Sequence, residues 1–517
     1  MIAAAVAGVL VDGFFAIVNF YPVAPHPSRG PKRYVIMQLD DDEAQWFTSN
    51  VLADFNAEHD ANLELLPVAD EEQLQAAPAD AIKQGKDVVA VALPVTQVDD
   101  AVASKLVRPF SGVVSSWRIA SDFHELGDDV LASGLANGTQ FFLPQMRVVH
   151  VGVYRASKVR DAVLHWSVLR PQIDAALKRV NGRGLPAGYE LELTPSSWDS
   201  YDLFVMAYYW AHRSYGGLPA RPRMAHRTGD SIDAQRDILG GIYAHGATDA
   251  TAGAFDAQPA RDYFGWEALY RAEGLYPPEM MGGDFDDEAV LDALAHGDIF
   301  FAPIDSMEAF DLHGGAHAGA VAHADDPTDL EFTSMPRGAS LALDAKGRPA
   351  RTHESFAFRE DWVWAVPAQA KAADQAYELV KFLWRPEIHA RLCEALGMLP
   401  TQPEVVAVRA SRFRLDWMSD IFAAGLAQEQ HGERMRRRLI HQGLGSVYVQ
   451  LWATIVGGGL APATDTAIAD VLRAPPPAKP LATSITHHTP ARPEASSAPP
   501  PELEDWESDA VLEGVPR

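Results

Sequence analysis

The segment DVVAVALP, Asp87 to Pro94, is the last of three short apolar stretches that decide the fold class of this chain. The stretches YVIMQL (Tyr34 to Leu39) and ANLELLP (Ala61 to Pro67) precede it and have the β-forming residues of strands. Between them lie two predicted helices, Glu43 to His59, with its apolar residues on one face, and Glu71 to Lys83. Strands that alternate with helices predict a parallel sheet covered by helices.

The pattern of strands begins again near residue 140. Two apolar stretches, Thr139 to Pro144 and Arg147 to Tyr154, are predicted strands, and a helix-rich region follows from about Ser157 to Ala295. A further buried strand is predicted at Asp298 to Pro303. This second series indicates a second α/β lobe.

Length and composition agree with two lobes and exclude several classes of protein. The chain has 517 residues, of which 47% are hydrophobic and 22% charged, as in globular proteins rather than fibrous or multi-span membrane proteins. A formal charge of −27 excludes nonspecific attraction to nucleic acid. The chain has one cysteine, Cys393, so an internal disulfide is not possible. We expect Cys393 to be a core residue.

The two ends differ from the body in composition. The first residues are almost wholly apolar and indicate a signal anchor or an uncleaved signal sequence, with a core element as the alternative because Asp12 interrupts the run. Arg29, Lys32 and Arg33 follow this run and oppose export by the positive-inside tendency. We divide the chain into an anchor segment (1–24), a linker (25–33), the first part of lobe 1 (34–148), a segment that forms mainly lobe 2 (149–350), a return segment with C-terminal helices (351–473), and a disordered, proline-rich acidic tail (474–517).

The order of segments from about Tyr34 to Arg473 resembles the sugar-type extracellular solute-binding proteins of ATP-driven importers. FLPQMRVVHVGVYR (Phe142 to Arg155) resembles their crossover into lobe 2, and SSWDSY (Ser196 to Tyr201) resembles a Thr-Trp-Asp-Glu-Leu helix start. Trp362 to His389 resembles their return strand and helix, and GMLP (Gly397 to Pro400) a closing segment. The chain departs from the family in having Arg359, Glu360 and Asp361 before Trp362, and no lipid-acceptor cysteine.

The resemblance implies a two-lobed, periplasmic-binding-protein-like α/β fold with a cleft between the lobes. It implies that the protein binds a small extracytoplasmic solute, expected to be a carbohydrate, and delivers it to the permease subunits of an ABC-type importer. We expect no catalysis, cofactor or metal, and a location outside the cytoplasm with membrane anchoring by the N-terminal segment. The alternative in the same fold is a solute-binding lobe that acts as a sensor or assembly component, suggested by the acidic tail.

Polar candidates for ligand binding follow the ends of predicted strands, where ligands approach open α/β sheets. Asp40, the first of the acidic run to Glu43, is a candidate, although such a run also caps a helix. Thr96 follows the third strand, and Gln145 lies beside the crossing between lobes.

Further candidates belong to lobe 2 and to the returning chain. Asp305 and Met307 follow the strand Asp298 to Pro303, with a surface loop as the alternative. Trp266 and Trp362 are the preferred aromatic candidates, because a sugar ring can stack on an indole, although core packing is the alternative for both. The other aromatic residues considered are Trp117, Tyr208, Tyr209, Trp210 and Tyr263.

A histidine-rich segment, His313 to His323, supports a different class of function. Its imidazoles, with Asp305 and Asp311 upstream, are ligand types for a divalent metal that activates water, as in a metal-dependent hydrolase. The residues between His313 and His317 are Gly, Gly and Ala, which disfavour a rigid helix and supply no general base. A flexible loop is therefore the favoured interpretation.

Overall fold

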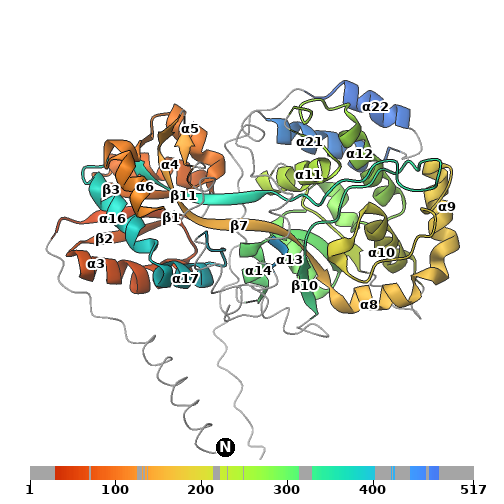
Figure 1. Cartoon of the computed structure of the whole chain (residues 1–517), viewed down its shortest axis with the longest axis horizontal. Helices are drawn as coiled ribbons and strands as arrows, with labels where there is room; N and C mark the ends of the chain where they lie inside the picture. Colours follow the sequence, from red (N-terminus) through yellow and green to blue (C-terminus); the bar gives the residue numbers. More distant parts are fainter. Residues whose placement is uncertain are drawn as a thin grey trace, which may run out of the picture. The chain divides into compact units, whose positions relative to one another are not determined.

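The computed structural model shows two lobes joined by shared strands (Figure 1). It describes residues 30–68, 71–124, 131, 134–136, 138–213, 222–229, 231–248, 250–283, 285–313, 329–401, 421, 423–425, 443–460 and 465–476. The expected anchor segment and the tail beyond residue 476 lie outside these ranges. Within them, no helix has both the length and the apolar character needed to cross a membrane.

Lobe 1 begins with the predicted alternation of strands and helices. Strands β1 (Arg33–Gln38), β2 (Leu63–Val68) and β3 (Val88–Pro94) are parallel in the order β2-β1-β3, which confirms the prediction. Every residue of β3 is buried, as expected for a parallel strand covered on both faces. The first helical segment is divided into α2 (Asp41–Phe47), a π-helical turn η1 (Thr48–Leu52) and α3 (Ala53–His59), and α4 (Glu71–Lys83) follows β2.

One long strand carries the chain from lobe 1 to lobe 2. The sequence predicted two strands here, but β7 (Phe142–Arg155) is continuous over 14 residues. The strand is continuous because it has hydrogen-bonding partners along its whole length, although these partners differ between its two parts. Its first part pairs with β11 (Arg359–Pro367), and its second part pairs with β9 (Ile299–Asp305) and β10 (Leu330–Thr333). The hydrophobic cores divide within it, since Val148 belongs to the lobe 1 core and Val149 to the lobe 2 core.

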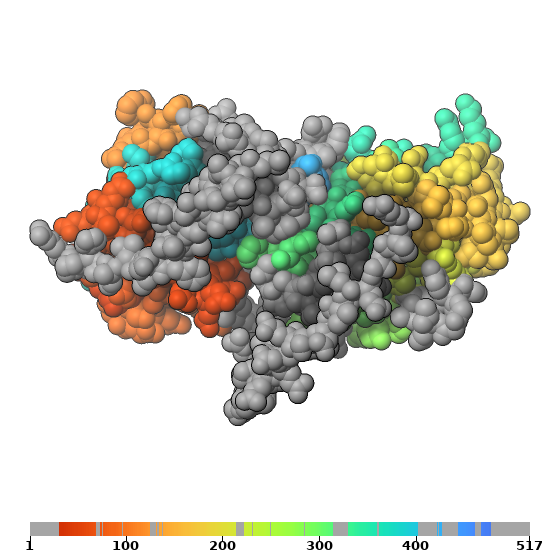
Figure 2. All heavy atoms as spheres, turned by 90° about the horizontal axis from the view of Figure 1, so that it is seen from below, coloured from red at the N-terminus to blue at the C-terminus, as the bar shows by residue number. Residues whose placement is uncertain are grey.

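Lobe 2 is built on the sheet β7-β9-β8, with β8 at Arg223–Met224 and β10 on β7. Its helices account for the predicted helix-rich region. They are α8 (Ala156–His165), α9 (Arg170–Asn181), α10 (Ser200–His212), α11 (Ile232–Ala244), α12 (Gln258–Ala272), α13 (Asp287–His296) and α14 (Ser306–His313). The red residues of lobe 1 and the yellow residues of lobe 2 occupy separate parts of the face in Figure 2.

The C-terminal part of the chain contributes to both lobes. After β11, the helices α16 (Ala373–Leu383) and α17 (Pro386–Ala395) return to the lobe 1 core, where Cys393 is buried as expected. Helices α21 (Leu444–Trp452) and α22 (Asp465–Arg473) instead pack on α11 and α12 of lobe 2. Each lobe is therefore assembled from segments that are distant in the sequence.

Candidate functional site

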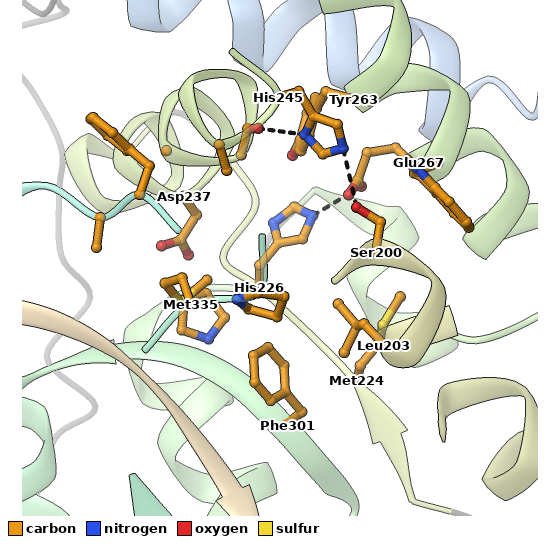
Figure 3. A pocket seen from close by; sticks show the side chains of 18 of the residues that line it. Ser200, Leu203, Met224, His226, Asp237, His245, Tyr263, Glu267, Phe301 and Met335 are labelled. Atoms are coloured by element: carbon orange, nitrogen blue, oxygen red, sulfur yellow. Dashed lines mark hydrogen bonds and ion pairs between the residues drawn. The ribbon is translucent and has the colours of Figure 1, made fainter. Parts of the chain in front are cut away.

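A pocket lies in lobe 2 between its sheet and the helices α10, α11 and α12 (Figure 3). The space inside it that no atom occupies, including the open solvent at its mouth, is about 910 Å³. His150 of β7 and Phe358, the residue before β11, both line it, so the pocket is at the end of lobe 2 where the crossing strands arrive. Its position makes it the leading candidate for a ligand site within the described residues.

Aromatic side chains form much of the pocket wall. They come from β9, from α12 and the loop after it, and from the segment that precedes β11, and they are Phe301, Tyr263, Trp266, Tyr270, Tyr276, Phe356 and Phe358. The predicted ligand residue Trp266 is therefore at this pocket, but only 1% of it is exposed. Its indole N–H donates to the Ala339 carbonyl at 2.6 Å, and Tyr201 meets its ring edge-on. These contacts fix the indole as one wall of the pocket.

A buried ion pair between His226 and Glu267 lies on the pocket wall. His226 Nε2 is 3.2 Å from Glu267 Oε2, and Nδ1 is 2.8 Å from the Arg227 carbonyl, so both ring nitrogens face acceptors. This arrangement suits the doubly protonated ring. Burial alone would lower the pKa of His226, but the charge and hydrogen bond of Glu267 outweigh it and raise that pKa. Tyr276 Oη and Trp452 Nε1 also donate to Glu267, at 2.8 and 2.7 Å.

A second polar pair, Ser200 and His245, lines the same pocket. His245 Nδ1 donates to the Gly241 carbonyl at 2.7 Å, and its Nε2 lies 3.3 Å from Ser200 Oγ (Figure 3). Burial lowers the pKa of His245, which favours the neutral ring with Nε2 as an acceptor. Ser200 Oγ also accepts from the Ala339 N–H at 3.1 Å. The pair therefore joins α10 to the end of α11 and to the segment around Ala339.

A buried charge cluster adjoins the pocket around Arg227, whose side chain is fully enclosed. Its guanidinium contacts Asp237, Asp287 and Glu308, and Asp237 also lines the pocket. Burial raises the pKa of Asp287 to about 7, with further contribution from neighbouring carboxylates. Charge pairing thus links α11, α13 and α14 beneath the pocket.

The predicted lobe 1 candidates lie on neighbouring strands. Trp362 of β11 is opposite Pro94 of β3, two residues before Thr96, and on its other side β11 pairs with β7 around Pro144 and Gln145. Thr96 is in the short helix η2 (Val95–Gln97). The tertiary structure thus brings Thr96, Gln145 and Trp362 to one region although they are distant in sequence.

The side chains of these candidates have different surroundings. Trp362 is 8% exposed and belongs to the lobe 1 core, where it packs with other apolar residues. Gln145 is buried, and its amide has no hydrogen-bond partner among the described residues. Asp40 caps α2, accepting from the Glu43 N–H at 2.7 Å, and Glu43 accepts from the Asp40 N–H at 3.1 Å. Asp40 therefore has the helix-capping role that was its alternative.

The lobe 2 candidates Asp305 and Met307 lie where β9 meets α14. Asp305 accepts from the backbone N–H groups of Met307 and Glu308, at 2.8 and 3.0 Å, so it orders the start of α14. It lies opposite His150 in the pairing of β7 with β9. Met307 is half-buried and packs against the core of lobe 1. Both residues are at the side of lobe 2 that meets the crossing strands.

Sequence reasoning missed most of the pocket's other residues. His150 lies in the predicted strand Arg147 to Tyr154, where nothing in the sequence marks it as a site residue. His226 and Glu267 are 41 residues apart, with no motif around either. An apolar helix face that includes a single glutamate, as in α12 around Glu267, is the one signal that could have indicated a buried polar pair.

The histidine-rich segment is only partly described. His313 ends α14, where partial burial lowers its pKa, and the rest of the segment to His323 lies outside the described residues. In the part of the chain that the structure describes, no group of three or more His, Cys, Asp or Glu side chains is arranged to hold a metal ion.

Two lobes, each with its own core and joined by β7 and β11, together with a pocket at the crossing, define a binding protein of the two-lobed type. A family model described as "Bacterial extracellular solute-binding protein" matches residues 50–414. The chain belongs to this family, which is one of binding proteins located outside the cytoplasm rather than of enzymes. The resemblance seen in the sequence is thereby confirmed. No curated protein sequence matches the chain.

Solved structures of the same fold include several binding proteins. The GacH receptor of Streptomyces glaucescens, solved unliganded and with acarbose, is 15% identical, with a TM-score of 0.59 over 86% of this chain and 97% of that one. The maltotriose-binding protein of Thermus thermophilus is 13% identical, with a TM-score of 0.58 over 86% and 98%. UgpB of Mycobacterium tuberculosis, solved with glycerophosphocholine, is 14% identical, with a TM-score of 0.57 over 86% and 98%. At these identities the likeness shows a shared two-lobed fold.

Proposed function

We propose that this protein captures a carbohydrate outside the cytoplasm and delivers it to the permease subunits of an ABC-type importer. The observation that supports this proposal most strongly is the family match over residues 50–414. Among proteins with the same fold, the GacH receptor was solved with acarbose and the Thermus thermophilus protein with maltotriose. Nothing in this function requires a reaction, a cofactor or a metal.

The mechanism of capture would be closure of the two lobes around the solute. Each lobe supplies part of the site, and the closed form is favoured by contacts that exist only when both lobes touch the ligand. In our proposal the lobe 1 contribution comes from Asp40, Thr96, Gln145 and Trp362. The lobe 2 contribution comes from Trp266, Asp305 and Met307.

The buried amide of Gln145 supports this assignment more directly than the other residues do. An amide without a partner costs free energy when it is buried, and the amide of Gln145 has none among the described residues. Because Gln145 is only 2% exposed, a ligand hydroxyl would reach it and offset that cost only after the lobes move apart. Gln145 lies on β7, the strand that both lobes share, so a ligand that contacts it is close to the axis of closure. We further propose that the N-terminal segment anchors the protein to the membrane.

Calorimetry and thermal unfolding of the full-length chain, against a panel of mono- and oligosaccharides, test the proposal. We expect at least one sugar to release or absorb heat, to raise the melting temperature and to be recovered unchanged, because a ligand that binds the folded state stabilises it. Binding of glycerophosphodiesters, peptides or polyamines with no response to any sugar would contradict the carbohydrate assignment. Tight zinc binding with turnover of a substrate would instead support the metal-dependent hydrolase.

Uptake measurements test delivery to an importer separately. Cells that lack the protein should lose import of the labelled sugar identified by calorimetry, and import should return when the gene is restored. Unchanged import in such cells would favour the alternative role as a sensor or assembly component.

A further inference from the structure

The lobe 2 pocket has an apolar interior even though several ionisable residues line it. Its aromatic wall is joined by Met224 and Met335. The part-exposed residues of the lining are Leu203, Met335 and Pro336, which are apolar, together with Gly240, Gly241 and Asp237, and the side chain of Asp237 is only 4% exposed. A sugar ring carries hydroxyl groups on most of its carbons, and each would need a hydrogen-bond partner in such a place. The wall alone therefore suits an alkyl or aryl group better than a bare sugar ring.

The polar side chains whose contacts are described are already engaged with protein groups. Glu267 accepts hydrogen bonds from His226, Tyr276 and Trp452, and Asp237 accepts from the backbone and guanidinium of Arg227. A ligand hydroxyl that replaced one of these donors would leave a buried charge or dipole without its partner. The free energy lost in this way is greater than the free energy gained from the new hydrogen bond.

The helix α11 leaves space in the pocket at one defined position. Gly240 lines the pocket, and a Cβ atom built on it meets only Phe358, at 3.9 Å, which is ordinary van der Waals contact. The adjacent Gly241 differs, because its Cβ would lie 2.2 Å from the ring of Tyr263. Gly240 therefore faces free volume beside Phe358, whereas Gly241 faces a packed helix.

We propose that this pocket binds an apolar substituent, alkyl or aryl, carried by the carbohydrate ligand. The inference rests on the proposed function and narrows its substrate class to amphiphilic glycosides. In this arrangement the apolar group enters lobe 2 beside Phe301 and Phe358, and the sugar stays toward the crossing strands, near His150 at the edge of the pocket. Burial of the apolar group from water supplies affinity that a free sugar lacks.

The test compares matched glycosides on the full-length chain by calorimetry. Hexyl β-maltoside, below its micelle-forming concentration, should bind about 100-fold or more tightly than methyl β-maltoside, because several additional methylene groups leave water. Phenyl β-maltoside should also bind more tightly than the methyl compound. The binding heat capacity change should be more negative for the hexyl compound, as expected for apolar burial.

A variant in which a larger side chain fills the pocket tests where the apolar group binds. Gly240→Leu should place a side chain beside Phe358 and abolish the advantage of hexyl over methyl β-maltoside, while the affinity for the methyl compound changes less than about 3-fold. Gly253→Leu is the control, since a Cβ at this exposed lobe 2 glycine meets nothing within 4 Å, and it should leave both affinities unchanged. Gly240→Ala serves if the leucine variant does not fold, and should reduce the advantage in part.

The outcomes separate the inference from the proposed function. Equal affinities for the hexyl and methyl compounds would overturn the inference and leave carbohydrate binding in place. An advantage for the hexyl compound that survives Gly240→Leu would also overturn it, because the apolar group would then bind elsewhere. If no glycoside of the gluco, galacto and malto series binds while a glycerophosphodiester does, the proposed function fails and the inference fails with it.

Discussion

Trp362 illustrates how burial changes the expected role of a single side chain. The sequence predicts that Trp362 stacks on a ligand, and the structure places Trp362 in the lobe 1 core with 8% exposure. An indole with so little exposed surface has few atoms available to a ligand unless the lobes rearrange. Its contribution to folding can therefore be measured apart from any contribution to binding.

We expect Trp362→Ala to lower the free energy of unfolding of the unliganded protein by about 3–5 kcal/mol, because removal of a buried indole leaves a cavity. Chemical denaturation measures this loss. Trp117→Ala is the control, since Trp117 is 78% exposed and its removal should cost less than about 0.5 kcal/mol. A roughly 5- to 150-fold loss of ligand affinity in the same variant would support the proposed ligand contact of Trp362, whereas an intact affinity together with the loss of stability would remove Trp362 from the proposed site.

The ion pair of His226 and Glu267 gives a pH-dependent contribution to stability. The pKa of His226 is raised in the folded protein above its unfolded value of about 6.5. The contribution is therefore fully present below about pH 6.5 and is lost as the pH rises through the folded pKa. Several buried histidines have lowered pKa values and act in the opposite direction, among them His150 and His389.

Glu267→Gln isolates this contribution by difference. We expect the variant to be less stable than the native chain by about 3–5 kcal/mol near pH 6, because a buried imidazolium loses its counter-charge. The difference should become smaller as the pH rises through the raised pKa of His226, because the ring then loses its charge in the native protein as well. Glu190→Gln, at a side chain that is 76% exposed, is the control. A difference that stays constant across this pH range would show that His226 is neutral in the native fold.

At the scale of elements, α11 carries two adjacent glycines with opposite surroundings, and only Gly241 faces α12. Gly241→Ala should destabilise the protein by about 1–3 kcal/mol, because the new methyl group overlaps the ring of Tyr263. Gly240→Ala, in the same helix, should be neutral or stabilise by up to about 1 kcal/mol through helix propensity. Thermal unfolding of the two variants measures the contrast, and equal effects would mean that α12 does not pack there as the structure shows.

Elements also show where local patterns are sufficient and where they are not. Periodicity predicted β1, β2 and β3 correctly, because each strand is short, apolar and bounded by turn residues. It divided β7 in two, since Gln145 and Arg147 interrupt its apolar run. The strand continues through them because it pairs with β11 on one side of the crossing and with β9 on the other.

At the scale of the whole molecule, the membership of the family places the folded body outside the cytoplasm, and the anchor segment remains a prediction. Protease added to intact spheroplasts should digest the body, while a cytoplasmic marker protein stays intact. If the N-terminal segment is an anchor, the undigested protein should sediment with membranes and be released by detergent. Protection of the body until lysis would contradict the export of the domain.

The sequence by itself determined the fold class, the two-lobed organisation and the family, because each depends on the order of strands and helices along the chain. Only the tertiary structure decided the pocket. Trp452 donates to Glu267 across 185 residues, and Trp362 comes beside Pro94 across the sheet. Periodicity reports which face of an element is apolar, but it cannot report which distant element covers that face. Burial and pairing of the site residues therefore follow from packing that no local pattern encodes.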